Sequence, residues 1–143
     1  MQEITIDYSL RATWQAVTKM YNEEARKFEG TMAIGFTLLS IDPKTGTPST
    51  ALGPKMGMEA TSLSRILKSM EQRGLIERRP NPNDGRGVLI HLTSFGLEMR
   101  NDSREAVRRF NDAVKAHIPQ EKLNNFFEVT EVIGKLITEK KIF

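Results

Sequence analysis

The chain has 143 residues, of which 38% are hydrophobic and 27% are charged, and it contains no cysteine. This length is enough for one domain with a buried core, and the composition is that of a globular protein and not of a disordered chain. The lack of cysteine excludes disulfides and thiolate metal sites. No apolar run approaches the roughly 18 residues of a membrane span, and the first ten residues lack the pattern of a signal peptide, so we expect a cytoplasmic protein.

The net charge of +3 is concentrated in one part of the sequence. Between residues 49 and 91 there are seven basic and four acidic side chains, so this segment carries the whole excess. A basic segment within one module suits a polyanionic partner. A chance imbalance of surface charge is an equally simple explanation of the charge taken alone.

The first third of the chain predicts two helices. Residues 9–28 repeat apolar side chains at spacings of three and four, which is typical of an amphipathic helix that Gly30 would end. Residues 31–41 are apolar almost all round and predict a buried helix. The segment Asp42 to Gly46 has the composition of a turn.

The basic segment begins with two further helices. Pro48 and Ser49 open a short helix that Gly57 closes, and Pro54 inside it predicts that it is short or kinked. Residues 59–73 predict a stronger helix that stops at Gly74. Its predicted inner face consists of Leu63, Ile66, Leu67 and Met70.

A hairpin and two helices are predicted to complete the chain. Residues 75–79 and 88–93 read as strands, and residues 80–87, rich in Pro, Asn, Asp and Gly, read as the loop between them. Residues 94–117 predict a long amphipathic helix with Met99, Ala106, Phe110, Ala113 and Val114 inward, and Pro119 starts the last helix. Because the first and last helices carry wide apolar faces, a second copy of the chain is the simplest cover for them.

The central helix pair and hairpin are the parts of a winged helix-turn-helix. Small and hydroxyl side chains at the start of the second helix would let its N-terminus enter the major groove, and Arg65 and Lys68 lie one turn further on. Arg86, flanked by glycines, is predicted at the tip of the loop, where a guanidinium suits the minor groove and Asp84 could orient it. The candidate DNA-binding residues are Ser49, Thr50, Ala60, Thr61, Ser62, Ser64, Arg65, Lys68, Asp84 and Arg86.

The stretch from Leu52 to Met99 resembles the MarR family of bacterial regulators. The shared features are a helix ending in Gly57, the following helix, the run RGLIERRPNPNDGR and the run LTSFG, which is similar to the family's LT..G. They cover about a third of the chain. Two positions depart from the family pattern, because Pro54 stands where a helix-compatible residue is usual and Glu59 where Ser is usual as the N-cap.

The resemblance implies a mainly α single domain over residues 1–143 with a small β-hairpin wing. Residues 31–94 would form the winged helix-turn-helix, and residues 1–30 and 95–143 the dimerisation helices. It implies a homodimer that binds double-stranded DNA at a pseudo-palindromic operator, as a ligand-responsive repressor without a cofactor or a membrane partner. It leaves room for a small-molecule effector, although the aromatics and Met56 with Met58 are better explained as core.

Three other interpretations are weaker. The sequence offers little from which to build a catalytic site, so we expect no enzyme and no catalytic residue. His91 and His117 with Glu98 or Asp102 do not have a diagnostic metal-binding spacing, so we expect no metal ligand. A winged helix that binds proteins without specific DNA binding remains the alternative, and the basic excess favours DNA.

Overall fold

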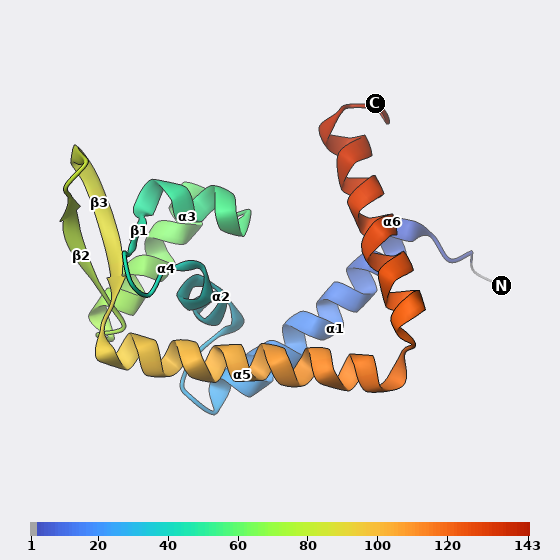
Figure 1. The fold of residues 1–143 in the computed structure, drawn as a ribbon, viewed down its shortest axis with the longest axis horizontal. Coiled ribbons are helices and arrows are strands. Elements are labelled where there is room, and N and C mark those ends of the chain that lie inside the picture. The colour runs from blue at the N-terminus through green and yellow to red at the C-terminus, as the bar shows by residue number, and fades with distance from the viewer. Residues whose placement is uncertain (1–2) are drawn as a thin grey trace. The chain divides into compact units, whose positions relative to one another are not determined.

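The computed structural model describes residues 3–143, with the exception of the side chain of Arg86. The elements are α1 (Ile6–Arg26), α2 (Met32–Ser40), β1 (Thr47–Pro48), α3 (Ser49–Met56), α4 (Ala60–Gln72), β2 (Ile76–Asn81), β3 (Asp84–Leu92), α5 (Ser94–His117) and α6 (Gln120–Thr138) (Figure 1). The chain forms two compact units, residues 1–106 and 107–143, and α5 runs unbroken through the boundary. The predicted order of six helices and a hairpin is confirmed.

Helix α1 is longer at its start than the sequence pattern predicts. Oγ1 of Thr5 accepts a hydrogen bond from the backbone N–H of Tyr8 and caps the helix, which begins at Ile6, three residues before the predicted start at Ser9. At the other end, Glu29 and not Gly30 takes the left-handed conformation, with φ of 57°. The N–H of Gly30 then donates to the carbonyl of Ala25 at 2.9 Å and closes the end of the helix.

A side chain of α1 holds the start of α2. Oδ1 of Asn22 accepts from the backbone N–H of Met32 at 2.9 Å, and Oγ1 of Thr31 accepts from the N–H of Ile34 at 3.2 Å. Two of the donors that a helix start leaves without a partner are thereby satisfied. The predicted burial of the segment 31–41 is confirmed for Ile34, Leu38 and Ile41, and Thr37 is buried as well. Its other apolar side chains are only partly buried: Met32, Ala33, Phe36 and Leu39.

The turn after α2 is built on one carboxylate. Oδ1 of Asp42 accepts from the backbone N–H groups of Thr45 and Lys44, at 3.0 and 2.8 Å, and these bonds lower the pKa of Asp42. Gly46 follows with φ of 74°, and a Cβ there would lie 2.7 Å from the ring of His91. The turn therefore requires glycine at this position.

The sheet has three strands in the order β1-β3-β2, so the prediction of a two-stranded hairpin was incomplete. The additional strand is Thr47–Pro48, which pairs antiparallel with Leu89 and Ile90 of β3. Two residues are too few to show a period of two in the sequence.

The predicted loop over residues 80–87 was wrong for most of its length. Only Pro82 and Asn83 lie between the two strands. Pro80 is paired with Val88 but Asn81 with Asp84, so residues 85–87 bulge out of β3. The backbone of Arg86 is therefore part of a bulged strand and not the tip of a loop.

The core lies in the first unit between α2, α3, α4, the sheet and the start of α5. Leu38, Leu52, Met70, Leu75 and Ile90 are fully buried. Ile34, Ile41, Leu63, Leu67, Ile76 and Met99 complete the cluster. Helices α3 and α4 and the sheet therefore pack on one common core and lie together in the first unit (Figure 1).

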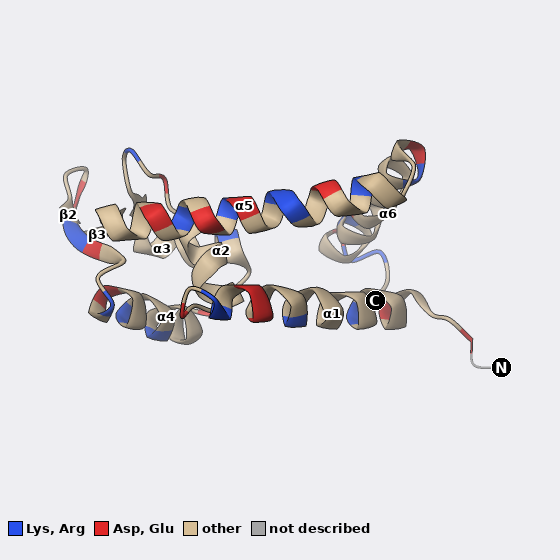
Figure 2. Cartoon of the chain, turned by 90° about the horizontal axis from the view of Figure 1, so that it is seen from below, with Lys and Arg blue, Asp and Glu red and all other residues tan. Residues whose placement is uncertain are grey.

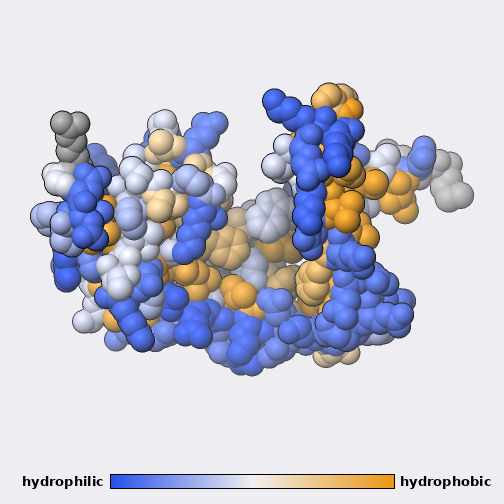
Figure 3. Space-filling model, turned by 45° about the horizontal axis from the view of Figure 1, so that its top comes forward, coloured by the Kyte–Doolittle hydropathy of each residue, from blue (hydrophilic) through white to orange (hydrophobic). Residues whose placement is uncertain are grey.

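The second unit consists of the second half of α5 and the helix α6. Leu123 is buried, but Ala113, predicted to face inward, is exposed. Most apolar side chains of α6 are exposed and follow the helix as a hydrophobic band (Figure 3). Over residues 3–143, no helix combines the length and the apolar character that a bilayer span requires.

Candidate nucleic-acid interface

Helices α3 and α4 are joined by a tight turn that glycine makes possible. Gly57 adopts a left-handed conformation with φ of 65°, and the N–H of Met58 donates to the carbonyl of Gly53 at 2.9 Å. A Cβ on Gly53 would lie only 3.1 Å from the carbonyl oxygen of Met58. Both glycines therefore let the chain reverse within three residues, as a helix-turn-helix requires.

Pro54 and Glu59, the two departures from the family pattern, are accommodated. Pro54 lies inside the short helix α3, which nevertheless runs to Met56. Glu59 occupies the N-cap position of α4, but its side chain makes no capping hydrogen bond. Its charge can still act favourably on the helix N-terminus.

The two faces of α4 differ in burial and in chemistry. Leu63, Leu67 and Met70 are buried in the core, as the sequence predicts, and Ile66 packs against it. The residues on the other side are all exposed: Ala60, Thr61, Ser62, Ser64, Arg65 and Lys68. The exposed side thus combines small and hydroxyl side chains at the helix start with two cations one turn further on.

The candidate residues at the start of α3 are less accessible. Ser49 is half-buried and Thr50 is exposed. Lys55, in the last turn of α3, donates from Nζ to the carbonyl of Ser40 at 2.8 Å and so ties α3 to the end of α2. This contact positions α3 and leaves Lys55 a structural role in the free chain.

The wing places Asp84 at the start of β3, next to the bulge. A Cβ on Gly87 would lie 3.1 Å from Oδ2 of Asp84, so the carboxylate lies against this glycine. Oδ1 of Asn81 accepts from the N–H of Asn83 at 3.0 Å and tightens the hairpin turn. The side chain of Arg86, the other predicted wing residue, lies outside the described part of the structure, so its contact with Asp84 stays a prediction.

Two basic residues of the wing were missing from the predicted site. Arg78 and Arg79 lie exposed on β2, where acidic and basic residues stand next to each other (Figure 2). Their position in the basic segment was visible in the sequence. What the sequence pattern could not show is that each one is paired with a carboxylate.

The aromatic residues considered as a ligand pocket behave in two ways. Tyr21 and Phe36 pack edge to face with ring centroids 5.6 Å apart, and burial raises the pKa of Tyr21. Trp14 and Phe28 are exposed. Within residues 3–143, His, Asp and Glu side chains do not gather in a group of three that could hold a metal ion.

A helix-turn-helix supported on one core with an adjoining β-hairpin defines the winged helix-turn-helix class of proteins. Comparison with known proteins shows which winged helix-turn-helix proteins this chain is similar to. The family model described as "MarR family" matches residues 31–88. The multiple antibiotic resistance protein MarR of Escherichia coli is 33% identical over 93 residues, which are 65% of this chain and 65% of that protein.

Solved structures agree along nearly the whole chain. The reduced form of MarR from E. coli superposes with a TM-score of 0.77 at 25% identity, covering 92% of this chain and 98% of the other. The structure of MepR from S. aureus in complex with DNA superposes with a TM-score of 0.84 at 18% identity, over 94% of this chain and 100% of MepR. Residues 31–88 are thus similar in sequence to the MarR family, and nearly the whole chain is similar in fold to E. coli MarR. In sequence, it spans 48–65% of the length of three curated relatives that it matches.

Proposed function

We propose that this chain is a sequence-specific DNA-binding transcriptional regulator. It would bind a pseudo-palindromic operator as a homodimer, with one α4 helix in the major groove of each half-site, and act as a ligand-responsive repressor. The main observation behind this proposal is that α4 has a buried apolar face and an exposed polar face. The exposed face has hydroxyl groups at the start of the helix, with Arg65 and Lys68 one turn further on. That is the arrangement that groove recognition by a helix needs.

The relatives support this assignment and give no reason to expect catalysis. The E. coli protein is named for multiple antibiotic resistance, a Bacillus subtilis relative at 32% identity is an organic hydroperoxide resistance transcriptional regulator, and MepR was solved with DNA bound. A regulator of this kind acts where the chromosome lies, so the proposal places the chain in the bacterial cytoplasm. It assigns no catalytic residue and no cofactor.

The ligand-responsive part rests on a different observation. Nε of Arg100 on α5 is buried and has no hydrogen-bond partner among the described residues. A buried polar group without a partner is costly, and an anionic ligand would satisfy it. Binding would favour a conformation whose half-site spacing does not fit DNA.

The test is a fluorescence-anisotropy titration with duplex DNA from upstream of the protein's own gene, at two salt concentrations, beside a scrambled duplex. We expect tight binding that prefers the native duplex and weakens steeply with salt, because phosphate contacts release counterions. Lys68→Ala should weaken both complexes and lower the salt slope by about 1, whereas Lys44→Ala, an exposed lysine in the turn before β1, should change little.

Each outcome of this titration is informative. Salt-sensitive binding without preference for the native duplex would point to an operator elsewhere in the genome, and a panel of genomic fragments would locate it. No binding to any fragment even at low salt would refute the proposal and favour a winged helix that binds proteins. Release of the native duplex by aromatic carboxylates, lost in Arg100→Gln, would support the effector part.

A further inference from the structure

The edge strand β2 carries two consecutive arginines that the proposed function does not use. In the sheet order β1-β3-β2, one side of β2 has no neighbouring strand among residues 3–143. Arg78 and Arg79 lie on it, and successive side chains of a strand point to opposite faces. The wing therefore presents a cation on each face of its outer edge.

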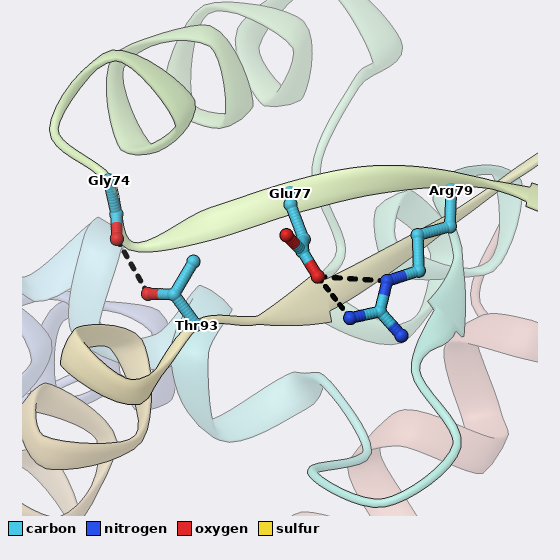
Figure 4. A network of polar contacts seen from close by, with 4 residues as sticks. All are labelled: Gly74, Glu77, Arg79 and Thr93. Carbon is cyan, nitrogen blue, oxygen red and sulfur yellow. Dashed lines mark hydrogen bonds and ion pairs between the residues drawn. The ribbon is translucent and has the colours of Figure 1, made fainter.

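Each of these cations is held by a carboxylate of the same unit. Nε of Arg78 donates to Oε2 of Glu71 on α4 at 3.1 Å. Nε of Arg79 donates to Oε1 of Glu77 at 2.8 Å, and Nη2 of Arg79 donates to the same oxygen (Figure 4). Glu77 and Arg79 stand two residues apart, so they share one face of β2.

Both pairs are open to solvent. The side chains of Arg78 and Glu71 are 39% and 44% exposed, and those of Arg79 and Glu77 are 56% and 47% exposed. Ion pairs as accessible as these contribute between 0 and about 1 kcal/mol to stability. They can therefore exchange partners at little cost to the fold.

The pair between Arg78 and Glu71 lies beside the candidate recognition surface. Glu71 follows Lys68 by three residues and Ser64 by seven on α4, so the three side chains run down the same side of the helix. Because Arg78 binds Glu71, its guanidinium is held where this side of α4 meets the wing. A DNA backbone that crosses from α4 to the wing would pass it.

We propose, on the basis of the function proposed above, that Arg78 and Arg79 bind DNA phosphates and that Glu71 and Glu77 occupy them in the free protein. A carboxylate offers a guanidinium the same kind of acceptor oxygens as a phosphate. Bound DNA must displace both carboxylates or accept their charge next to its own. The two glutamates therefore limit the affinity of the wing for any polyanion.

This mechanism predicts an effect that does not depend on base sequence, since phosphate contacts position a protein without reading bases. Glu71→Gln and Glu77→Gln should each tighten binding to the native and the scrambled duplex by the same factor, about fivefold, corresponding to roughly 1 kcal/mol of relieved competition. Each should also steepen the dependence on salt by up to about 0.9 per phosphate gained. Arg78→Gln and Arg79→Gln should weaken binding to both duplexes equally.

The control is Glu131→Gln. Glu131 forms an exposed ion pair with Lys135 on α6 and its replacement changes the net charge by the same amount. Anisotropy titrations of the parent chain and the five variants measure the DNA affinities, and melting curves confirm that each variant is folded. If the parent chain binds DNA but Glu71→Gln and Glu77→Gln bind it no more tightly than Glu131→Gln does, the inference about the two glutamates is wrong and the proposed function still stands. A parent chain that binds no duplex would refute the proposed function as well.

Discussion

Gly96 and Thr93 join the start of α5 to the end of α4. Oγ1 of Thr93 donates to the carbonyl of Gly74 at 2.6 Å (Figure 4). The same oxygen accepts from the N–H of Gly96 at 3.0 Å, and the N–H of Thr93 donates to the carbonyl of Leu75 at 3.1 Å. A Cβ on Gly96 would lie 3.0 Å from the carbonyl carbon of Leu75 and closer still to its oxygen. The LTSFG run is thus explained by a cap and a backbone contact.

Gly96→Ala should lower the free energy of unfolding by about 3 kcal/mol, because backbone atoms on both sides must move apart to admit the methyl group. Gly134→Ala on α6 is the matched control, since nothing lies within 4 Å of its Cβ position. That change should raise stability by roughly 0.5–1 kcal/mol through helix propensity. Urea denaturation of the three proteins measures both effects, and equal stabilities would show that α5 does not touch Leu75 in this way.

At the scale of elements, α4 illustrates how a periodic pattern becomes a surface. Leu67 is 3% exposed in the centre of its inner face, and Lys68 next to it is exposed. Leu67→Ala should reduce the free energy of unfolding by about 2–5 kcal/mol, since it leaves a cavity in the core. Lys68→Ala should stay within about 0.5 kcal/mol of the parent. Thermal melting tests the pair, and an unchanged melting temperature for Leu67→Ala would mean that the faces of α4 are assigned wrongly.

The helices could be predicted from the sequence because each is long enough to show several periods. The buried face of α4 and the limits of α5 agree with the pattern. The sheet could not be predicted as well, because Gly85 and Gly87 indicate a loop locally but lie in a bulged strand that pairing imposes. Strand β1 has only two residues and is recognised as a strand only because it pairs with β3.

The predicted site has a similar division. The exposed positions of α4 followed from its period, since a buried apolar face implies an opposite one. The pairing of Arg78 with Glu71 did not follow from the period, because these residues stand seven apart in sequence and belong to different elements, α4 and β2, on either side of the turn at Gly74. Contacts of that kind depend on how α4 and β2 pack, and a single sequence does not contain that information.

At the scale of the whole molecule, apolar surface is left uncovered at both ends of the chain. Ile6, Leu10 and Trp14 of α1 are exposed. On α6 the exposed apolar residues are Phe126, Phe127, Val129, Val132, Leu136 and Ile137. A soluble monomer rarely leaves so many large apolar side chains in water, so a second copy of the chain should cover them.

Sedimentation equilibrium should therefore give a mass about twice the 16.2 kDa of one chain at micromolar concentration. Phe126→Glu should shift the equilibrium toward monomer by at least about tenfold, because a carboxylate buried without a partner in an apolar interface is costly. Asn125→Glu, at an exposed polar position on the same helix, introduces the same charge and should leave the mass unchanged. The loss of the dimer should also remove operator affinity while α4 stays folded, since a single half-site offers only half of the phosphate and base contacts. A parent chain that sediments as a monomer at all concentrations would contradict the assignment of α1 and α6 to a dimer interface.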